Sequence, residues 1–124
     1  MSIIEEFESR EDFITFLKKM ETKECKLNGI VIKFTASWCA PCQKIKEFVH
    51  NEFNNLPNTI QAANLDVDDN FDLFANMKKI KQLNGIPAIL FYKKGNVSFI
   101  SDESVLGADE KSIKDFFVNV RKHA

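Results

Sequence analysis

Two kinds of hydrophobic pattern alternate along the chain. In four segments the apolar residues recur every three or four positions, which predicts amphipathic helices. These segments are residues 10–22, 43–56, 70–83 and 109–121. Between them lie short apolar runs that predict buried strands. The runs are residues 29–36, 59–67 and 87–92, followed by a turn over 93–96 and a strand over 97–101 that completes a hairpin.

Strands that alternate with helices predict an α/β fold, in which a central mixed sheet is covered by helices on both faces. Residues 3–7 are expected to add a short edge strand, which gives four to five strands and about four helices. A chain of 124 residues that is 44% hydrophobic can bury one core and has no room for a second. We therefore expect a single domain over residues 1–124.

Composition and charge exclude several classes of protein. Three cysteines are too few, and of the wrong parity, for a secreted disulfide framework, and residues 1–6 lack the basic and apolar parts of a signal peptide. No run approaches the ~18 apolar residues of a membrane span. A net charge of −1 gives no electrostatic reason to bind nucleic acid. The expectation is a cytoplasmic monomer that binds neither membranes nor nucleic acid.

The most informative motif is Trp38-Cys39-Ala40-Pro41-Cys42, at the junction of a predicted strand and a predicted helix. Two thiols at this spacing can close a reversible disulfide. At the start of a helix, unpaired N–H groups and the positive end of the helix dipole stabilise a thiolate at Cys39. Pro41 is tolerated there because its missing N–H would have had no helical partner. The motif predicts a redox-active dithiol that needs no cofactor.

The two cysteines are predicted to form the catalytic pair, with different roles. Cys39 lies nearer the end of the helix and is expected to be the exposed nucleophile, whereas Cys42, one turn inside, is shielded. Attack by Cys39 on a substrate disulfide gives a mixed disulfide, which Cys42 then resolves. Trp38, Ala40 and Pro41 are expected to support the pair.

Other interpretations of the cysteines are weaker. Two inert core thiols do not account for the flanking Trp38 and Pro41. A zinc or iron–sulfur site would recruit Cys25 or His50, but three cysteines fall short of four ligands at workable spacing, so no metal is expected. Cys25 is expected to be structural, with a regulatory or intermolecular disulfide as the alternative.

Further motifs accompany the cysteines, namely Asp66-Val67-Asp68, Gly85-Ile86-Pro87 and Gly107 before the last helix. Together with Trp38 to Cys42, they make the chain resemble the thioredoxin family over nearly its whole length. The resemblance implies a thioredoxin fold and a protein thiol–disulfide oxidoreductase. Its partners would be disulfide-containing proteins and an electron donor such as a thioredoxin reductase.

The resemblance also implies a substrate-binding surface. Pro87 is expected to be a cis-proline that faces the disulfide, with Ile86 offering backbone groups to an extended substrate. Trp38 and Gly107 are expected to help form the docking surface.

One departure from the family's pattern affects the predicted site. Most thioredoxins have a buried Asp six residues before the nucleophile, and here that position is Lys33. The usual lysine partner on the next strand aligns with Asn64. Lys33 either extends its ammonium past the sheet edge into solvent or stays near Cys42, where its charge favours the thiolate. The sequence leaves both interpretations open.

Three smaller departures follow. Ala40 replaces the more common glycine and stiffens the turn. Glu47 stands where the family has a kinking proline, so a straighter helix is expected. The segment from Gly95 to Gly107 is longer than is typical, and residues 101–104 are expected to be an inserted loop that adds two acids beside the substrate surface.

Two other functions remain open from the sequence. A thioredoxin-fold binding or scaffold module would suit the longer loop and would survive loss of both cysteines. A dedicated disulfide oxidase or isomerase is permitted by the absence of the usual anion near Cys42.

Overall fold

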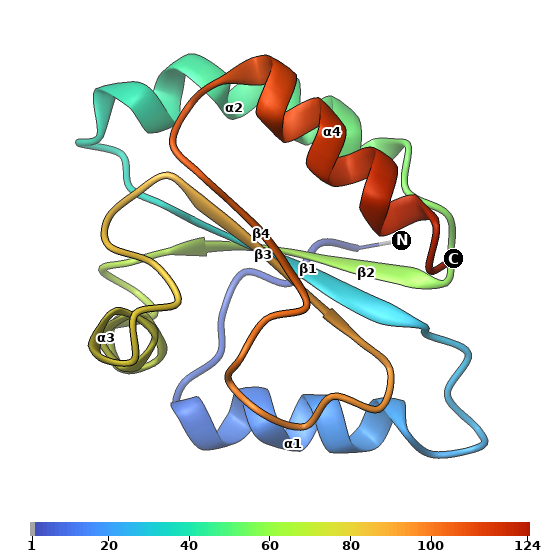
Figure 1. Cartoon of the computed structure of the whole chain (residues 1–124). Coiled ribbons are helices and arrows are strands. Elements are labelled where there is room, and N and C mark those ends of the chain that lie inside the picture. The colour runs from blue at the N-terminus through green and yellow to red at the C-terminus, as the bar shows by residue number, and fades with distance from the viewer. Residues whose placement is uncertain (1) are drawn as a thin grey trace.

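The computed structural model describes residues 2–124, which form one mixed sheet flanked by four helices (Figure 1). In chain order the elements are α1 (Arg10–Met20), β1 (Gly29–Thr35), α2 (Ala40–Asn54), β2 (Ile60–Asp66), α3 (Phe71–Lys79), β3 (Ala88–Lys93), β4 (Glu103–Leu106) and α4 (Glu110–Arg121). The strand order is β2-β1-β3-β4. Strands β1 and β2 are parallel, and β3 is antiparallel to both of its neighbours. The predicted mixed α/β sheet is confirmed.

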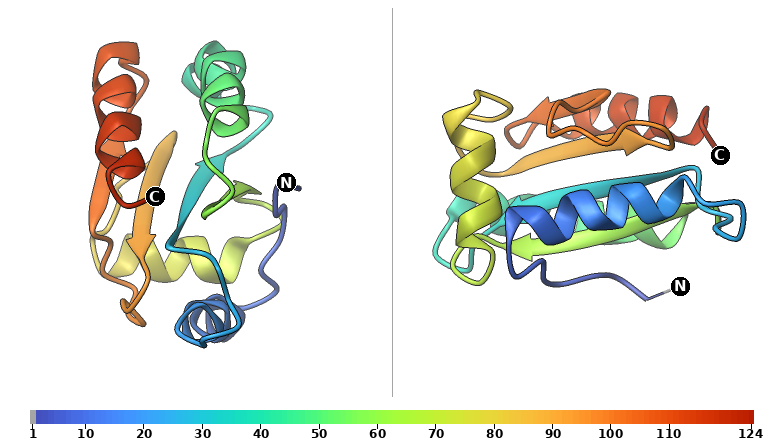
Figure 2. Two further views of the ribbon diagram at one scale, coloured as in Figure 1. Left: turned by 90° about the vertical axis from the view of Figure 1, so that its right-hand side faces the viewer. Right: turned by 90° about the horizontal axis from the view of Figure 1, so that it is seen from below.

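The helices cover both faces of the sheet in pairs. Figure 2 shows α2 and α4 on one face and α1 and α3 on the other. Alternate residues of β1 serve the two faces, because successive side chains of a strand point in opposite directions. Ile32 and Phe34 pack in the cluster that contains α1 and α3, whereas Val31 packs with α2 and α4. By the same alternation Lys33, two positions after Val31, faces the side of α2.

Side-chain caps mark the beginnings of α1 and α4, and one ion pair joins α1 to α3. Ser9 caps α1 by accepting the N–H of Asp12, and Asp109 caps α4 by accepting the N–H of Ser112. Helices α1 and α3 are joined by Arg10, which donates to Asp72 at 2.7 Å. Because that guanidinium donates to its carboxylate, the pKa of Asp72 is lowered to about 2.

The prediction of a strand over residues 97–101 is wrong. The last strand is β4, which pairs with β3 and begins at Glu103. Residues 98–100 are bends because the side chain of Asn96 organises them, accepting the N–H of Ser98 at 3.0 Å and donating to the carbonyl of Ile100 at 2.8 Å. Glu103 and Ser104, expected in an inserted loop, therefore lie in a strand.

The ends of several elements also differ from the expected ones. The edge strand expected over residues 3–7 is reduced to a single bridge between Ile4 and Ala63. Helices α1 and α3 end at Met20 and Lys79, earlier than the periodicity predicted, and α2 already begins at Ala40. After α3 the buried Leu83 extends the apparent period, because packing outside a helix also buries apolar residues.

Candidate active site

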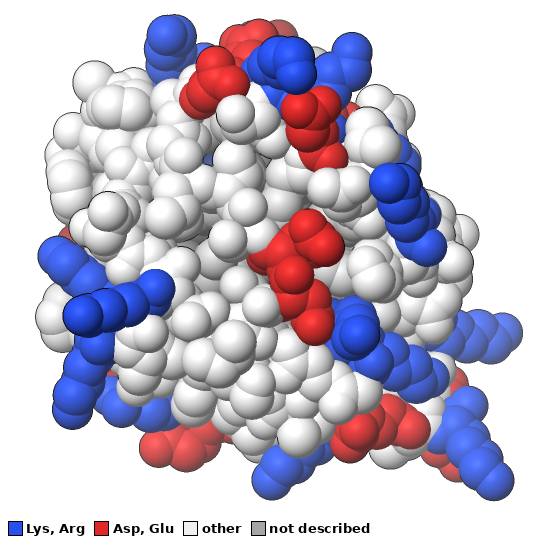
Figure 3. Space-filling model, viewed as in Figure 1, with Lys and Arg blue, Asp and Glu red and all other residues white. Residues whose placement is uncertain are grey.

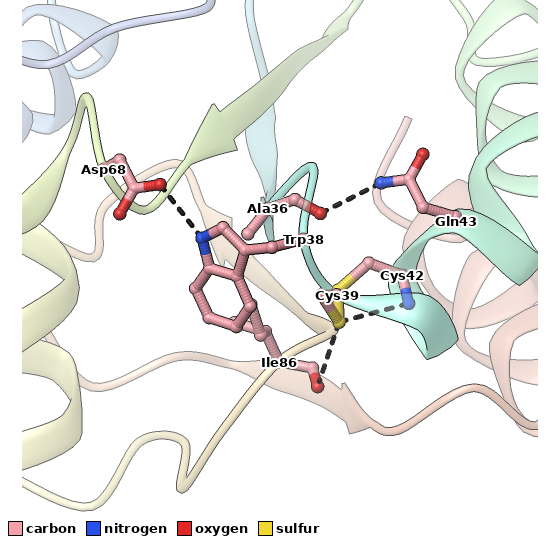
Figure 4. The surroundings of a disulfide bond; sticks show 7 residues. All are labelled: Ala36, Trp38, Cys39, Cys42, Gln43, Asp68 and Ile86. Atoms are coloured by element: carbon pink, nitrogen blue, oxygen red, sulfur yellow. Dashed lines mark hydrogen bonds between the residues drawn. A yellow bond between two sulfur atoms is a disulfide. The ribbon is translucent and has the colours of Figure 1, made fainter.

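The Cys39–Cys42 pair lies where β1 passes into α2 (Figure 4). The two cysteines form a disulfide, and their Cα atoms are 5.2 Å apart. Cys39 is the N-cap of α2, and Pro41 lies in the first turn, where no helical partner exists for a backbone N–H. The short connection from β1 therefore presents both sulfurs at the positive end of the helix dipole.

The surroundings of Cys39 favour negative charge on its sulfur. The backbone N–H of Cys42 donates to Cys39 Sγ at 3.2 Å, as it does to the side chain of an ordinary N-cap residue. Cys39 keeps 6% of its surface exposed, whereas Cys42 is fully buried. The order of exposure is the one expected for a nucleophile and a resolving thiol, and those roles stay predictions.

The tertiary structure brings Ile86, Pro87 and Gly107 to the disulfide. The Ile86–Pro87 peptide bond is cis, and the carbonyl oxygen of Ile86 lies 3.9 Å from Cys39 Sγ (Figure 4). The N–H of Gly107 donates to the carbonyl of Pro87 at 2.9 Å, which joins the start of β3 to the end of β4. Gly107 has a φ of +94°, a conformation that favours glycine.

Trp38 stands beside the disulfide, and two thirds of its surface is exposed. Its indole Nε1–H donates to Asp68 Oδ2 at 3.0 Å, and the N–H of Asp68 donates to Asp66 Oδ1 at 2.8 Å. On the other side, Gln43 Nε2 donates to the carbonyl of Ala36 at 2.9 Å and ties α2 to the loop before the cysteines. The Asp66-Val67-Asp68 motif was the signal for Asp68 as a partner of the indole, whereas nothing in the sequence indicated Gln43.

The surface around the amino-terminal end of α2 carries few charges. In Figure 3 the upper left of the molecule, where this end of α2 lies, is almost free of charged side chains, and basic side chains border it below, where α3 lies. Among the exposed large apolar residues of the described chain, Trp38 adjoins Cys39 and Leu106 adjoins Gly107 in the sequence. Exposed apolar residues of this size, near a redox pair, are typical of a docking surface.

Lys33 is enclosed on the α2 side of the sheet, with only 3% of its surface exposed, so it does not extend into bulk solvent. Its strand partners are Asn64 in β2 and Ile89 in β3. Burial and, to a smaller extent, the nearby charge of Lys46 together lower the pKa of the Lys33 ammonium to about 8. Lys33 lines two cavities, and Cys42 lines neither.

Two remaining expectations concern α2 and metals. Helix α2 runs without interruption through Glu47, as the absence of a proline there predicted. Within residues 2–124 the structure contains no group of three or more His, Cys, Asp and Glu residues placed to hold a metal ion. No helix in the same range has the length and apolar character that crossing a membrane requires.

Cys25 lies apart from the disulfide, in the segment between α1 and β1, and it is a half-buried free thiol. Its carbonyl accepts from Lys94 Nζ at 3.2 Å, a contact that any residue at this position can make. We therefore expect Cys25→Ser to leave the rate at which the protein reduces insulin, if it does so, within about twofold of the wild type. Steady-state insulin reduction measures this, and a tenfold loss would show that Cys25 takes part in the reaction.

Comparison with known proteins gives a consistent result. A family model described as thioredoxin matches residues 8–119. Thioredoxin 3 of Plasmodium falciparum is 32% identical over 90 residues, which cover 73% of this chain and 47% of that protein. The thioredoxin of Mus musculus is 36% identical over 66 residues, which cover 53% of this chain and 58% of that protein. The thioredoxin of Geodia cydonium is 38% identical over 86 residues, which cover 69% of this chain and 74% of that protein.

The matched part of the chain thus spans about half the length of the first two relatives. Solved structures show the same fold at lower identity. The thioredoxin of Fasciola hepatica matches with a TM-score of 0.69 at 22% identity and covers 100% of both chains. A thioredoxin of Plasmodium falciparum matches with a TM-score of 0.68 at 19% identity and covers 94% of this chain and 98% of its own.

Proposed function

Because the chain belongs to the thioredoxin family, we propose that it is a protein thiol–disulfide oxidoreductase that acts as a single domain over residues 1–124. The observation that carries this proposal is the disulfide at the start of α2, in which the N–H of Cys42 donates to Cys39 Sγ. A sulfur held in this way is stabilised as a thiolate when the disulfide is reduced, and the thiolate is the reactive form.

The reaction follows from the order of exposure of the two sulfurs. The Cys39 thiolate attacks one sulfur of a substrate disulfide, forms a mixed disulfide and releases the other sulfur as a thiolate. Cys42 then loses its proton and attacks Cys39 Sγ, which closes the Cys39–Cys42 disulfide and releases the second substrate thiolate. The substrate gains two electrons and the protein loses two, so a donor must reduce the pair before the next turnover.

The substrate is a protein segment in an extended conformation. It docks on the surface formed by Trp38, Ile86, Pro87 and Gly107, beside the exposed Leu106. The carbonyl of Ile86 is close enough to Cys39 to place a bound backbone over the reacting sulfur. Ala40 and Pro41 hold the first turn of α2 rigid behind that sulfur.

The partners and the compartment follow from the same chemistry. Disulfide-containing proteins are the substrates, and a reductase of the thioredoxin reductase type supplies electrons. A reducing compartment, the cytoplasm, suits a chain with one redox pair and one free thiol, because structural disulfides do not persist there. The protein acts as a monomer, with the disulfide facing its substrate rather than a second copy.

Insulin reduction driven by dithiothreitol tests the proposed activity. We expect the wild-type protein to accelerate the precipitation of insulin chains roughly tenfold or more over dithiothreitol alone. The matched control is the double variant Cys39→Ser, Cys42→Ser, which keeps the fold and should give the dithiothreitol rate. Equal rates for both proteins would assign the fold to a binding or scaffold role instead.

A further inference from the structure

A pair of cavities lies along the outer side of α2, separate from the disulfide. The larger has a volume of about 530 Å³ and the smaller about 290 Å³. Five residues are shared by the linings of both cavities: Glu5, Lys33, Gln43, Lys46 and Asn64. We call the combined space the Lys33 groove. Its larger part falls within the ~300–1,000 Å³ range of small-molecule sites in proteins.

Lys33 gives the groove a buried cation without a partner. Its side chain is nine-tenths or more covered, and no hydrogen bond or ion pair to it exists within residues 2–124. Among residues 2–124, the polar side-chain atoms that are fully buried and lack a hydrogen-bond partner are Thr59 Oγ1 and Asn76 Nδ2. Lys33 Nζ is not among these fully buried atoms, so it stays accessible from the groove.

A second cation reaches the same space from α2. Lys46 lines both cavities and lies close enough to Lys33 for its charge to lower the pKa of the buried ammonium. Two like charges that face one space repel each other unless an anion lies between them. A largely buried ammonium without a counter-ion is also costly, because it has lost part of its water without gaining a partner.

The carboxylates at the groove do not supply that anion. Four carboxylates line the groove, namely Glu5, Glu47, Asp66 and Asp69, yet none of them forms an ion pair with Lys33 or Lys46. The groups that shift the pKa of Lys33 include no carboxylate. The described residues therefore leave both ammonium groups free to pair with an anion from outside.

The larger cavity also has an apolar wall. Val49 and Phe53 of α2 line it and are buried, and Ile3 lines it from the amino-terminal segment. An inorganic anion such as phosphate would leave this wall without a contact. A ligand with a charged head and an apolar chain uses both parts of the groove.

We propose that the Lys33 groove binds a small organic carboxylate with an apolar chain, whose carboxylate pairs with Lys33 and Lys46. Its chain packs against the wall formed by Val49 and Phe53. The site does not depend on the cysteines and adds a ligand-binding function to the proposed oxidoreductase.

The test is the binding of octanoate to the oxidised full chain, measured by isothermal titration calorimetry. We expect a Kd below about 1 mM for the wild type. Lys33→Met keeps the length of the side chain and removes its charge, so it should weaken binding about tenfold or more. Lys46→Met removes an exposed charge and should weaken binding by a smaller factor. The matched control is Lys44→Met, since Lys44 is an exposed lysine of α2 that lines neither cavity.

Three further probes separate the parts of the proposal. Octan-1-ol has the chain without the charge, and phosphate has the charge without the chain, so each should bind the wild type about tenfold more weakly than octanoate. N-acetylglutamate methylamide represents an acidic side chain of a partner protein and should also bind more weakly. The proposal is overturned if octanoate fails to bind at roughly 10 mM, if Lys33→Met binds it as tightly as the wild type, or if any of the three probes matches it.

Discussion

Replacing Cys42 with Ser is expected to convert the protein into a trap that stays covalently attached to its substrates. Cys39 can still attack a substrate disulfide, because its sulfur keeps the N–H of residue 42 as a hydrogen-bond donor. The serine hydroxyl cannot then displace the substrate, so the mixed disulfide accumulates. Cys39→Ser, which removes the nucleophile, should instead lower turnover by about 10³-fold or more and trap nothing.

Non-reducing gels of reduced Cys42→Ser protein mixed with insulin or a cell extract measure the trap. Bands of higher mass should appear for Cys42→Ser, should disappear on addition of dithiothreitol, and should be absent for Cys39→Ser. Cys25→Ser, Cys42→Ser is the control that excludes attachment through the remaining thiol. If Cys42→Ser turns over insulin at the wild-type rate, the two-cysteine mechanism is wrong.

Replacing Lys33 with Met is expected to stabilise the fold at neutral pH. Burial lowers the pKa of Lys33 in the folded protein from 10.5 to about 8, so folding opposes its charged form. A difference of about 2.5 units, at about 1.4 kcal/mol per unit, corresponds to a cost on the order of 3 kcal/mol when the lysine is charged. Met fills the same space without charge, and the free energy of unfolding should rise by roughly 2–3 kcal/mol at pH 7.

The effect has a definite dependence on pH. Between pH 8 and 10.5 the unfolded chain binds a proton at Lys33 that the folded chain does not, so the stability of the wild type rises with pH through this window. Below pH 8 both states are charged and the full cost is present; above 10.5 both are neutral and the cost is gone. The advantage of Lys33→Met should therefore shrink across the window.

Urea unfolding at pH 7 and again near pH 10.5 measures both quantities. Lys44→Met serves as the control for loss of one positive charge, because Lys44 is exposed on α2, the helix that covers Lys33. It should change stability by no more than about 0.5 kcal/mol at either pH. If Lys33→Met is less stable than the wild type at pH 7, the ammonium has a stabilising partner and the Lys33 groove holds no unpaired cation.

Local patterns in the sequence were enough to predict three features of the protein, namely its helices, three of its strands and its disulfide. The helical periodicities predicted all four helices, because an apolar stripe needs one covered face whatever lies opposite it. The apolar runs predicted β1, β2 and β3 for a similar reason. The Cys-x-x-Cys spacing predicted the disulfide, since both sulfurs lie on neighbouring positions of one turn. The Ile86-Pro87 dipeptide predicted the cis bond only through resemblance to a family.

Other features required contacts between segments that are distant in the sequence. The last strand begins only at Glu103 because the chain before it is held elsewhere: the N–H of Ser101 donates to Gln82 Oε1, 19 positions away, at 2.9 Å. Gly29 looks like an ordinary turn glycine, yet its α-carbon lies against the ring of Phe91 from β3, where a Cβ would collide. Neither contact has a local signal.

The sequence by itself determined which residues form the disulfide, because Cys39 and Cys42 are neighbours on one helical turn and local geometry suffices. The tertiary structure decided what surrounds them. The carbonyl of Ile86 lies beside Cys39 although the two residues are 47 positions apart in the sequence. The N–H of Gly107 donates to the carbonyl of the adjacent Pro87. The tertiary structure also decided that Lys33 is enclosed. The strand pattern alone does not show whether a charged residue in a central strand reaches solvent, because that depends on the helix that covers it.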